Sequence, residues 1–436
     1  VMETAIAVRQ MIGADRTMGV RISADEFLQG GLTLDDMCAV IFKLSSAVQL
    51  DFVNVSHSAY HGSYTISTQM ADMAFSNQQF RYLTEAISTN LDGLERKPVI
   101  MSVCRYNRVE LAEDMLATGK ADMIGMARAH VADPDLVNKA YSGNIEDTIP
   151  CIGCNQGCAD MLAQSLAISC LTNPRAGKEA DWPAPFLQST KVKKPVLVVG
   201  GGPAGMEASG ILAERGFSVT LADSHSVLGG TLNWLEKMPM RQEFLQLKKR
   251  QMRRLEQHKV NLQLECKVGD DILEKHQESH IIWAAGAQAQ ALSSGGVALT
   301  LEQALTEPEK LGKKVLMVDH LGTWAVVSVA EFLADIGKQV SLIVPTGIAG
   351  WKISIYSSFA LKHRLKEKNV QLIPGHRLLD FANGRADIED LSVHDSTQAL
   401  LADSVIAPIS GKPNGPPEKN RTILNIGDSV SARTAL

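Results

Sequence analysis

The sequence lacks the features that would place it in several large classes of protein. No apolar run approaches the ~20 residues that a membrane-spanning helix needs, and Val1-Met2-Glu3-Thr4 does not resemble the start of a signal peptide. Acidic residues exceed basic ones by 48 to 43, which leaves a formal net charge of −5 and no basic footprint for nucleic acid or an anionic membrane. Seven cysteines are too few for a disulfide scaffold in 436 residues. We therefore expect a globular cytoplasmic protein, with neither nucleic acid nor a membrane as partner.

Residues 1–150 alternate between helical and strand patterns. The strands are expected at 18–23, 52–56, 98–103 and 121–126, and the helices before them at 5–12, 34–48, 80–90 and 109–118. Apolar strands that alternate with helices indicate a parallel sheet. A complete (β/α)8 barrel takes ~250 residues, so four such units correspond to about half of one. The sequence therefore predicts an α/β fold that begins with the C-terminal half of a TIM barrel, without the first four strands.

Four cysteines lie within 20 positions, in the pattern C-x2-C-x3-C-x11-C. They are Cys151, Cys154, Cys158 and Cys170. Three closely spaced thiolates and a more distant fourth are typical of an iron–sulfur cluster, in which each iron takes one thiolate. Structural zinc is the alternative, but zinc usually takes two C-x2-C pairs or adds histidines, and this segment has neither. The sequence thus predicts a 4Fe-4S site. The three remaining cysteines are isolated and are expected to be small buried hydrophobes: Cys38, Cys104 and Cys266.

A second α/β pattern follows a Pro- and Lys-rich linker. Its first strand runs into G-x-G-x-x-G and then a helix, with Gly200 for the tight turn, Gly202 for close approach of a pyrophosphate and Gly205 for helix–strand packing. The next strand ends in Asp223, at the spacing of an acid that accepts hydrogen bonds from an adenosine ribose. An ordinary glycine turn is the alternative, but this turn has its strand, its helix and its acid. We predict a site for FAD or ADP.

Two later segments resemble motifs of flavoproteins that have two dinucleotide domains. Residues 281–287 read as a strand that ends in Ala-Ala-Gly, and residues 425–428 end in Gly-Asp, where Asp428 would meet the ribityl chain of a flavin. A second strand–turn–helix begins at Val315. Its turn has one glycine, and His320 and Trp324 would crowd a pyrophosphate there. We expect this second nucleotide-binding-like domain to be degenerate and to bind no NAD(P)H.

Taken in this order, the segments resemble one family: the iron–sulfur branch of the old yellow enzyme (NADH:flavin oxidoreductase) family. That branch includes trimethylamine dehydrogenase, dimethylglycine- and N-methylproline-type demethylases and 2,4-dienoyl-CoA reductase. The stretches that carry the resemblance are Gly-Val-Arg-Ile-Ser at 19–23, Asp-Phe-Val-Asn-Val-Ser at 51–56, Ala-Asp-Met-Ile-Gly-Met-Ala-Arg at 121–128, Asp-Pro-Asp-Leu at 133–136, the first cysteine pair and Thr-Asn-Pro-Arg-Ala-Gly at 172–177.

The resemblance implies an FMN site in the barrel. Arg21 would lie against the N1/O2 edge of the flavin, while Arg105, Gly125 and Arg128 would hold the phosphate. Relatives usually have glycine where this chain has Cys104, which restricts access of a phosphate to the backbone there. Without the resemblance, surface salt bridges would be the better interpretation of these arginines.

The loop after the second strand would lie at the catalytic face of a barrel. Its four candidates for substrate binding or proton transfer are His57, Tyr60, His61 and Tyr64. Isolated histidines and tyrosines are more often structural, and the two interpretations stand about even here.

The domains expected are 1–150 for the half barrel, 151–194 for the cluster segment and linker, 195–295 with 405–436 for the FAD or ADP domain, and 296–404 for the inserted second nucleotide-like domain. A four-stranded half barrel has two open edges. We therefore expect either that the sequence is a piece of a longer chain or that a second polypeptide completes the barrel.

The resemblance implies an FMN- and 4Fe-4S-dependent oxidoreductase that demethylates a small N-methylated amine and passes electrons to an acceptor protein. We also expect a homo-oligomer. One alternative is an NAD(P)H-dependent 2,4-dienoyl-CoA-type enoate reductase, which needs a working second nucleotide site. The other is an electron-transfer subunit of a multi-chain complex.

Overall fold

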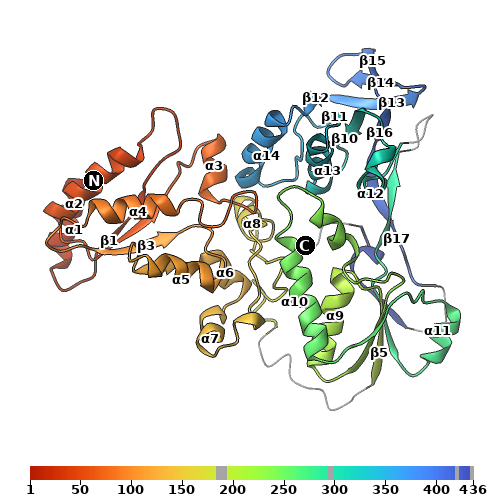
Figure 1. The fold of residues 1–436 in the computed structure, drawn as a ribbon, viewed down its shortest axis with the longest axis horizontal. Helices are drawn as coiled ribbons and strands as arrows, with labels where there is room; N and C mark the ends of the chain where they lie inside the picture. The colour runs from red at the N-terminus through yellow and green to blue at the C-terminus, as the bar shows by residue number, and fades with distance from the viewer. Residues whose placement is uncertain (183–193, 293–297, 418–421, 433–436) are drawn as a thin grey trace. The chain divides into compact units, whose positions relative to one another are not determined.

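A computed structural model describes residues 1–182, 194–292, 298–417 and 422–432 (Figure 1). The chain forms two compact units, Val1–Gly177 with Ser354–Leu361, and Lys178–Ile353 with Lys362–Leu436. Most of the predicted linker, the predicted boundary between residues 295 and 296 and the last four residues lie outside the described ranges. Each unit is described by itself.

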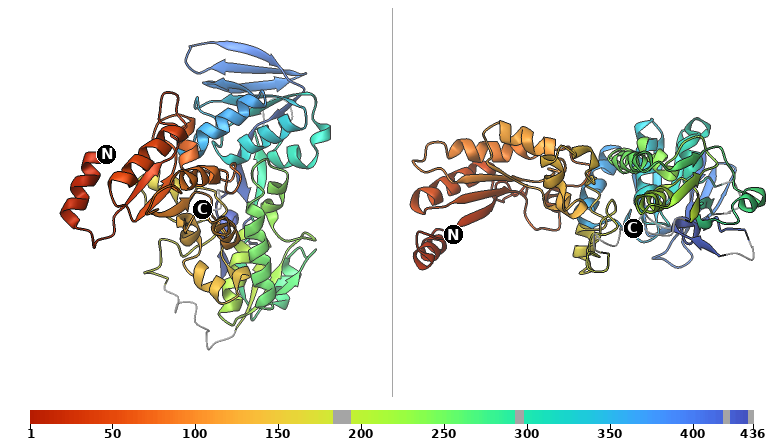
Figure 2. Two further views of the ribbon diagram at one scale, coloured as in Figure 1. Left: turned by 60° about the vertical axis from the view of Figure 1, so that its left-hand side comes forward. Right: turned by 90° about the horizontal axis from the view of Figure 1, so that it is seen from below.

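The first unit is built on one parallel sheet whose strands follow in the order of the chain. Its strands are β1 (Gly19–Ser23), β2 (Phe52–Ser56), β3 (Val99–Val103) and β4 (Met123–Gly125). The helices that alternate with them are α1 (Met2–Ile12), α2 (Leu34–Ala47), α4 (Arg81–Asn90) and α5 (Val109–Ala117). In Figure 2 the N-terminal helix α1 stands apart from the sheet, and the helices that follow lie along it. All four predicted strands and all four predicted helices are confirmed.

The two faces of this sheet differ in polarity. Val53 and Val55 of β2 point to the helix side and pack in a core with Ile41 and Ile87, all of them buried. The alternate positions of β2, including Asn54 and Ser56, point to the other face, since successive strand residues alternate. Helix α2 begins at the N-cap Thr33 with a capping box, which satisfies the first free backbone amides. Hydrophobic burial therefore fixes the helix side, while the opposite face is mixed, with Met101 and Val103 of β3 beside the polar positions of β2.

Short elements follow the sheet. They are α3 (Tyr64–Gln69), α6 (Ala127–Ala132), α7 (Leu136–Tyr141), η1 (Ile145–Asp147) and α8 (Ala159–Ala163). The cysteine segment runs from the loop before α8 to the loop after it. The loop before α8 contacts the segment between α3 and α4: the amide of Met73 donates a hydrogen bond to the carbonyl of Gly153 over 2.9 Å.

The second unit contains a five-stranded parallel sheet in the order β18-β8-β5-β6-β7. Its strands are β5 (Pro195–Val199), β6 (Ser218–Ala222), β7 (Asn261–Gln263), β8 (His280–Trp283) and β18 (Ile423–Asn425). The helical elements are α9 (Pro203–Glu214), η3 (Gly230–Glu236), α10 (Phe244–Gln257), α11 (Asp270–Lys275) and η5 (Gly427–Ser429). Strand β18 pairs with β8 in parallel, so the C-terminal segment returns to the first dinucleotide sheet.

A second parallel sheet, in the order β12-β11-β10-β16, forms the rest of this unit. Its strands are β10 (Lys314–Val318), β11 (Gln339–Val344), β12 (Gln371–Pro374) and β16 (Ser404–Ile406). An antiparallel sheet of β13 (His376–Ala382), β14 (Arg385–Asp390) and β15 (Thr397–Leu401) and a ribbon of β9 (Ala287–Ala291) with β17 (Pro408–Pro413) accompany it. The helices are α12 (Leu301–Thr306), η4 (Pro308–Lys310) and α13 (Trp324–Asp335), and α14 (Ile355–Glu367) belongs to the first unit up to Leu361 and to the second unit after it. The boundary expected between residues 404 and 405 falls inside β16.

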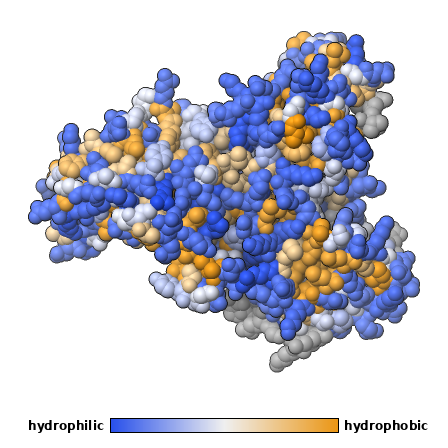
Figure 3. All heavy atoms as spheres, in the orientation of Figure 1, coloured by the Kyte–Doolittle hydropathy of each residue, from blue (hydrophilic) through white to orange (hydrophobic). Residues whose placement is uncertain are grey.

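The face of the molecule drawn in Figure 3 is mostly hydrophilic. Hydrophobic residues show on it in separate groups. None of the helices within the described ranges combines the length and the apolar character of a membrane span.

Candidate functional site

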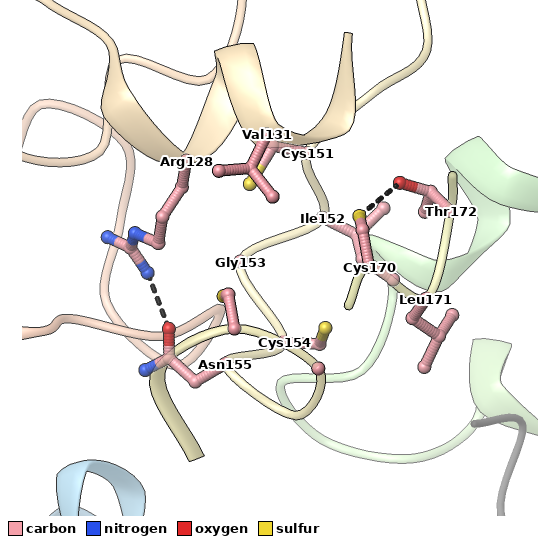
Figure 4. Close-up of a pocket in the computed structure, with 12 residues that line it drawn as sticks. Arg128, Val131, Cys151, Ile152, Gly153, Cys154, Asn155, Cys170, Leu171 and Thr172 are labelled. Atoms are coloured by element: carbon pink, nitrogen blue, oxygen red, sulfur yellow. Dashed lines mark hydrogen bonds between the residues drawn. The ribbon is translucent and has the colours of Figure 1, made fainter. Parts of the chain in front are cut away.

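The four predicted cluster cysteines line one pocket (Figure 4). None of them is in a disulfide. Apolar side chains of Val131, Ile152 and Leu171 share the lining with Arg128 and Thr172, and the Sγ of Cys170 lies 3.3 Å from the hydroxyl of Thr172. The four cysteines thus border the same pocket, and their role as cluster ligands stays a prediction. Within the described ranges, no three side chains of His, Cys, Asp or Glu converge to hold one metal ion.

Burial controls the charge state of these thiols. It raises the pKa of Cys151, Cys154 and Cys158, because a thiolate loses its hydration in this pocket. The nearby guanidinium of Arg128 works in the opposite direction on the pKa of Cys151 and Cys158. The pocket therefore favours neutral thiols unless cations enter it, which is the condition under which a metal centre binds thiolates.

Asn155 holds the cysteine loop, and sequence reasoning missed it. The residue is buried at a φ of +58°, a conformation that asparagine tolerates better than most side chains. Its amide donates to the carbonyl of Met70 over 2.5 Å, and its Oδ1 accepts from Arg128 over 2.7 Å. The same Nη1 of Arg128 also donates to the carbonyl of Ala71 over 2.9 Å. Arg128, predicted to bind a flavin phosphate, thus also lines the cysteine pocket.

Three predicted flavin ligands lie near the carboxyl end of the first sheet. Arg21 is exposed, and it donates to Asn54 over 3.2 Å and to Ser56 over 2.8 Å on the neighbouring strand. Arg105 is buried and follows Cys104 directly after β3, while Gly125 ends β4. A Cβ added to Gly125 would stand 2.7 Å from Cγ1 of Val103. The absence of a side chain at Gly125 therefore allows Val103 of β3 to pack against β4 at this position.

Cys104 stands in a backbone conformation that suits glycine. Its φ is +84°, and that of Arg105 is +62°. A side chain in the left-handed region costs about 1–2 kcal/mol, which explains why glycine is usual here in the family that the sequence resembles. Burial raises the pKa of the Cys104 thiol, opposed by the charges of Arg128, Arg105 and Arg21. The turn at residue 104 is thus surrounded by the three predicted flavin arginines.

The four residues of the loop after β2 do not gather into one constellation. His57 is buried; its ring stacks on Phe80 with centroids 4.1 Å apart, and its Nε2 lies 3.0 Å from the carbonyl of Thr68. Burial lowers the pKa of His57 to about 4, so the ring is neutral near pH 7. Tyr60 and Tyr64 are 76% and 42% exposed. His61 is also exposed, with Nδ1 3.0 Å from the hydroxyl of Ser63. The assignment of these four residues to substrate or proton chemistry stays a prediction.

The first glycine-rich turn is crowded at three glycines and open at one. A Cβ at Gly200 would overlap the carbonyl of Ala284, and a Cβ at Gly205 would overlap the carbonyl of Gly200. A Cβ at Gly201 would overlap Leu228. At Gly202, the N-cap of α9, a Cβ would meet nothing within 4 Å. The turn therefore leaves free space at the helix N-terminus, where a phosphate is favoured.

Asp223 holds the same turn from the end of β6. Its Oδ2 accepts from the amide of Gly201 over 2.5 Å, and its Oδ1 accepts from the amide of His225 over 2.7 Å. The Nδ1 of His225 also lies 2.9 Å from Oδ1. Each carboxylate oxygen can accept more than one hydrogen bond, so these contacts do not exclude a ribose.

The three flavoprotein motifs meet at the carboxyl ends of neighbouring strands. The carbonyl of Trp283, at the end of β8, accepts from the amide of Ile426 over 2.9 Å and from the hydroxyl of Ser429 over 3.1 Å. A Cβ on Gly427 would stand 2.8 Å from the Cβ of Ala204 in the first turn of α9. Asp428 is half-buried beside it in η5. Segments far apart in sequence thus form one edge, as open α/β sheets do at their ligand sites.

The second turn, between β10 and α13, is covered. A Cβ on Gly322 would overlap the indole of Trp351, a residue that sequence reasoning missed. Trp324, the first residue of α13, carries the guanidinium of Arg241 over its ring at 3.5 Å from the centroid. Asp319 accepts from the amides of Gly322 and Gly350 over 2.8 and 2.7 Å. Trp351, which lies outside the predicted motif, thus contacts this turn, while crowding of a pyrophosphate by His320 and Trp324 stays a prediction.

The chain has an α/β fold, and two parts of it match known protein families. Residues 194–417 match the family model described as pyridine nucleotide-disulphide oxidoreductase, and residues 1–147 match the NADH:flavin oxidoreductase / NADH oxidase family. The chain belongs to the pyridine nucleotide-disulphide oxidoreductase family. The part before that domain matches the NADH:flavin oxidoreductase family, which is of the TIM-barrel type.

Three curated relatives are similar to much of this chain. N,N-dimethylglycine/sarcosine dehydrogenase of Chromohalobacter salexigens is 30% identical over 78% of this chain and 50% of its own length. A metal reductase of Desulforamulus reducens is 32% identical over 77% of this chain and 49% of its own. A probable N-methylproline demethylase of Rhizobium meliloti is 27% identical over 78% and 49%. The chain thus spans about half the length of these relatives.

The same fold occurs in solved structures. The 6-hydroxypseudooxynicotine amine oxidase of Pseudomonas geniculata N1 superimposes with a TM-score of 0.88 over 99% of this chain and 67% of that one, at 22% identity. At this identity the likeness shows the fold alone.

Proposed function

We propose that this chain carries the flavin and electron-transfer machinery of a dehydrogenase that demethylates a small N-methylated amine. The observation that carries the proposal is the contrast between the two nucleotide turns. The turn at Gly202, the N-cap of α9, is open, whereas Trp351 lies against Gly322, the residue before the N-cap of α13. A protein that takes electrons from its substrate has no need of NAD(P)H at the second turn. Two of the relatives, the N,N-dimethylglycine/sarcosine dehydrogenase and the probable N-methylproline demethylase, support the choice of an N-methylated substrate.

The cysteine pocket would hold a 4Fe-4S cluster through Cys151, Cys154, Cys158 and Cys170. The donor set fits this group because four thiols, with no histidine or carboxylate among them, line a partly apolar pocket without converging on a single point. In a four-iron cluster each thiolate binds its own iron. Such a cluster accepts and donates single electrons, which suits transfer to an acceptor protein.

The turn around Cys104 would hold FMN. Arg21 would stabilise negative charge on the reduced ring, and Arg105, Gly125 and Arg128 would serve the phosphate. Bound FMN would supply a hydride acceptor for the N-methyl carbon of the amine, and hydrolysis of the oxidised substrate by water would give formaldehyde and the demethylated amine. The exposed Tyr60, His61 and Tyr64 would face the substrate, and neutral His57 would keep their loop in place through its bond to Thr68.

FAD or ADP would occupy the first dinucleotide turn. Gly200, Gly202 and Gly205 would shape the cradle, Asp223 would accept the ribose hydroxyls, and Asp428 would approach the ribityl chain if the ligand is FAD. The convergence of these motifs at one edge of the sheet supports this assignment.

Anaerobic reduction of the flavin-loaded full chain tests the proposal. We expect dimethylglycine or sarcosine to bleach the flavin band and NADH and NADPH to leave it unchanged. Bleaching by NAD(P)H but not by methylated amines would instead establish the enoate-reductase alternative. Native mass spectrometry addresses the electron-transfer-subunit alternative, which requires a copurifying partner that contains the FMN.

A further inference from the structure

Lys248 of α10 lies beside the first dinucleotide turn without belonging to any of the motifs that define it. Its side chain is only half-exposed, unlike that of the neighbouring Lys249, which is exposed. The Nζ of Lys248 donates to Oδ1 of Asn233 in η3 over 2.6 Å. A single neutral hydrogen bond leaves two of the three ammonium donors for another acceptor.

The Gly229–Gly230 segment connects this lysine to the turn. The amide of Gly229 donates to the carbonyl of Gly201 over 2.8 Å. A Cβ on Gly230 would stand 3.2 Å from Cα of Gly202, so the two backbones are in contact. The segment therefore lies against the backbone of the turn, next to the open position at Gly202.

Lys248 and Asn233 pack on the first of these two glycines. A Cβ on Gly229 would stand 3.0 Å from Cε of Lys248 and 2.5 Å from Oδ1 of Asn233. The position thus requires glycine for two reasons, because its φ is +121° as well. The close approach brings the lysine stem and its anchor to the backbone that borders the free space at Gly202.

The charge balance at this turn calls for a cation. The pyrophosphate of FAD carries two negative charges, and that of ADP carries more. The N-terminus of α9 offers about half a positive charge. Asp223 adds a negative charge next to Gly201. Farther along α9, Glu207 is already paired with Arg254 over 2.9 Å.

We propose that Lys248, held in place by Asn233, is the cation that neutralises the pyrophosphate of the adenine nucleotide at the first turn. The proposal rests on the proposed FAD or ADP site. It adds a binding residue that stands outside the glycine motif and after the acid at the end of β6. Lys248 sets the affinity for the phosphate part of the ligand and makes no contribution to the affinity for adenosine.

Isothermal titration of the full chain with ADP and with adenosine tests this assignment. We expect K248M to weaken ADP binding by about tenfold or more, as loss of a charge-assisted hydrogen bond does. The same variant should bind adenosine as the unsubstituted chain does. The salt dependence of ADP binding should become shallower in K248M. K249M, the matched control, should leave ADP affinity within about twofold of the original value, since an exposed charge is screened.

K248R provides a second variant in case K248M unfolds. It keeps the charge and should retain most of the ADP affinity. Equal ADP affinity in K248M and the unsubstituted chain would overturn the proposal. An equal loss for ADP and adenosine would also overturn it, because that result assigns Lys248 to the fold alone. If the nucleotide-free chain binds neither ligand, the proposed nucleotide site fails as well, which distinguishes that failure from failure at Lys248.

Discussion

The indole of Trp351 lies against Gly322 at the second nucleotide turn, so that a single added carbon at this glycine would overlap the ring. Gly322 has a φ of +66°, and its amide donates to Asp319 over 2.8 Å. The contact thus joins the turn after β10 to the segment before α14.

This contact predicts coupling between the two residues. G322A should lower the free energy of unfolding by about 2 kcal/mol, from the left-handed backbone and from overlap with the ring. In a W351A background the same change should cost only about 1 kcal/mol, because only the backbone term remains. Urea denaturation of the four variants in a double-mutant cycle measures the difference. Additive effects would show that the ring moves away at no cost.

The first turn should respond differently to added carbon. G202A should leave the stability almost unchanged, because the new Cβ meets nothing within 4 Å and φ is −74°. It should weaken ADP binding by about tenfold or more, since the methyl group enters the space for the pyrophosphate.

G205A is the matched control for G202A. Its Cβ overlaps the carbonyl of Gly200, so it should destabilise the fold by roughly 2 kcal/mol or more. Titration with ADP and thermal melting separate the two effects; full ADP affinity in G202A would contradict the cradle.

Removal of one cluster cysteine should remove the iron. C154A deletes a half-buried thiol that lines the pocket, and the purified variant should lose most of its iron and acid-labile sulfide. C266A should retain both, because Cys266 packs beside the core of the first dinucleotide sheet. Iron and sulfide analysis of the two proteins makes the comparison. Holoprotein without iron or sulfide before any substitution would refute the cluster assignment outright.

His57 should make the fold acid-sensitive. Burial lowers the pKa of His57 from 6.5 to about 4 in the folded state, so between these values the unfolded chain binds a proton that the folded chain does not. The contribution of a neutral His57 is complete above pH 6.5 and falls as pH decreases toward 4, by about 3 kcal/mol in all. In H57Q this part of the pH dependence should disappear. Stability curves of both proteins from pH 7 to pH 4 provide the measurement, and parallel curves would contradict the assignment.

Cys104 should tolerate glycine. C104G relieves a side chain at a φ of +84° and should raise the free energy of unfolding by up to about 1 kcal/mol. C38G serves as the control, because Cys38 lies within helix α2, where glycine costs about 1 kcal/mol. Chemical denaturation of both variants decides the sign. A loss of stability in C104G would mean that packing of the thiol outweighs the backbone strain.

The sequence by itself determined the elements and the motifs of this protein. Periodic apolar residues located the four strands of the first sheet and the four helices that alternate with them, since burial on one side of a parallel sheet imposes that pattern locally. Spacing alone identified the four cysteines that line one pocket, and the order of strand, glycines and helix identified the turn at Gly202. These features are local, because a few consecutive residues satisfy their geometric requirement.

Only the tertiary structure decided how distant segments meet. Trp351 covers Gly322, Asn155 holds both Arg128 and Met70, and Lys248 reaches the Gly229 segment through Asn233. The burial of His57 against Phe80, which removes its charge near pH 7, was equally invisible in the sequence. Such contacts depend on how chain segments pack in space. A period or a spacing within one segment does not encode which side chain from another segment will fill the gap beside it.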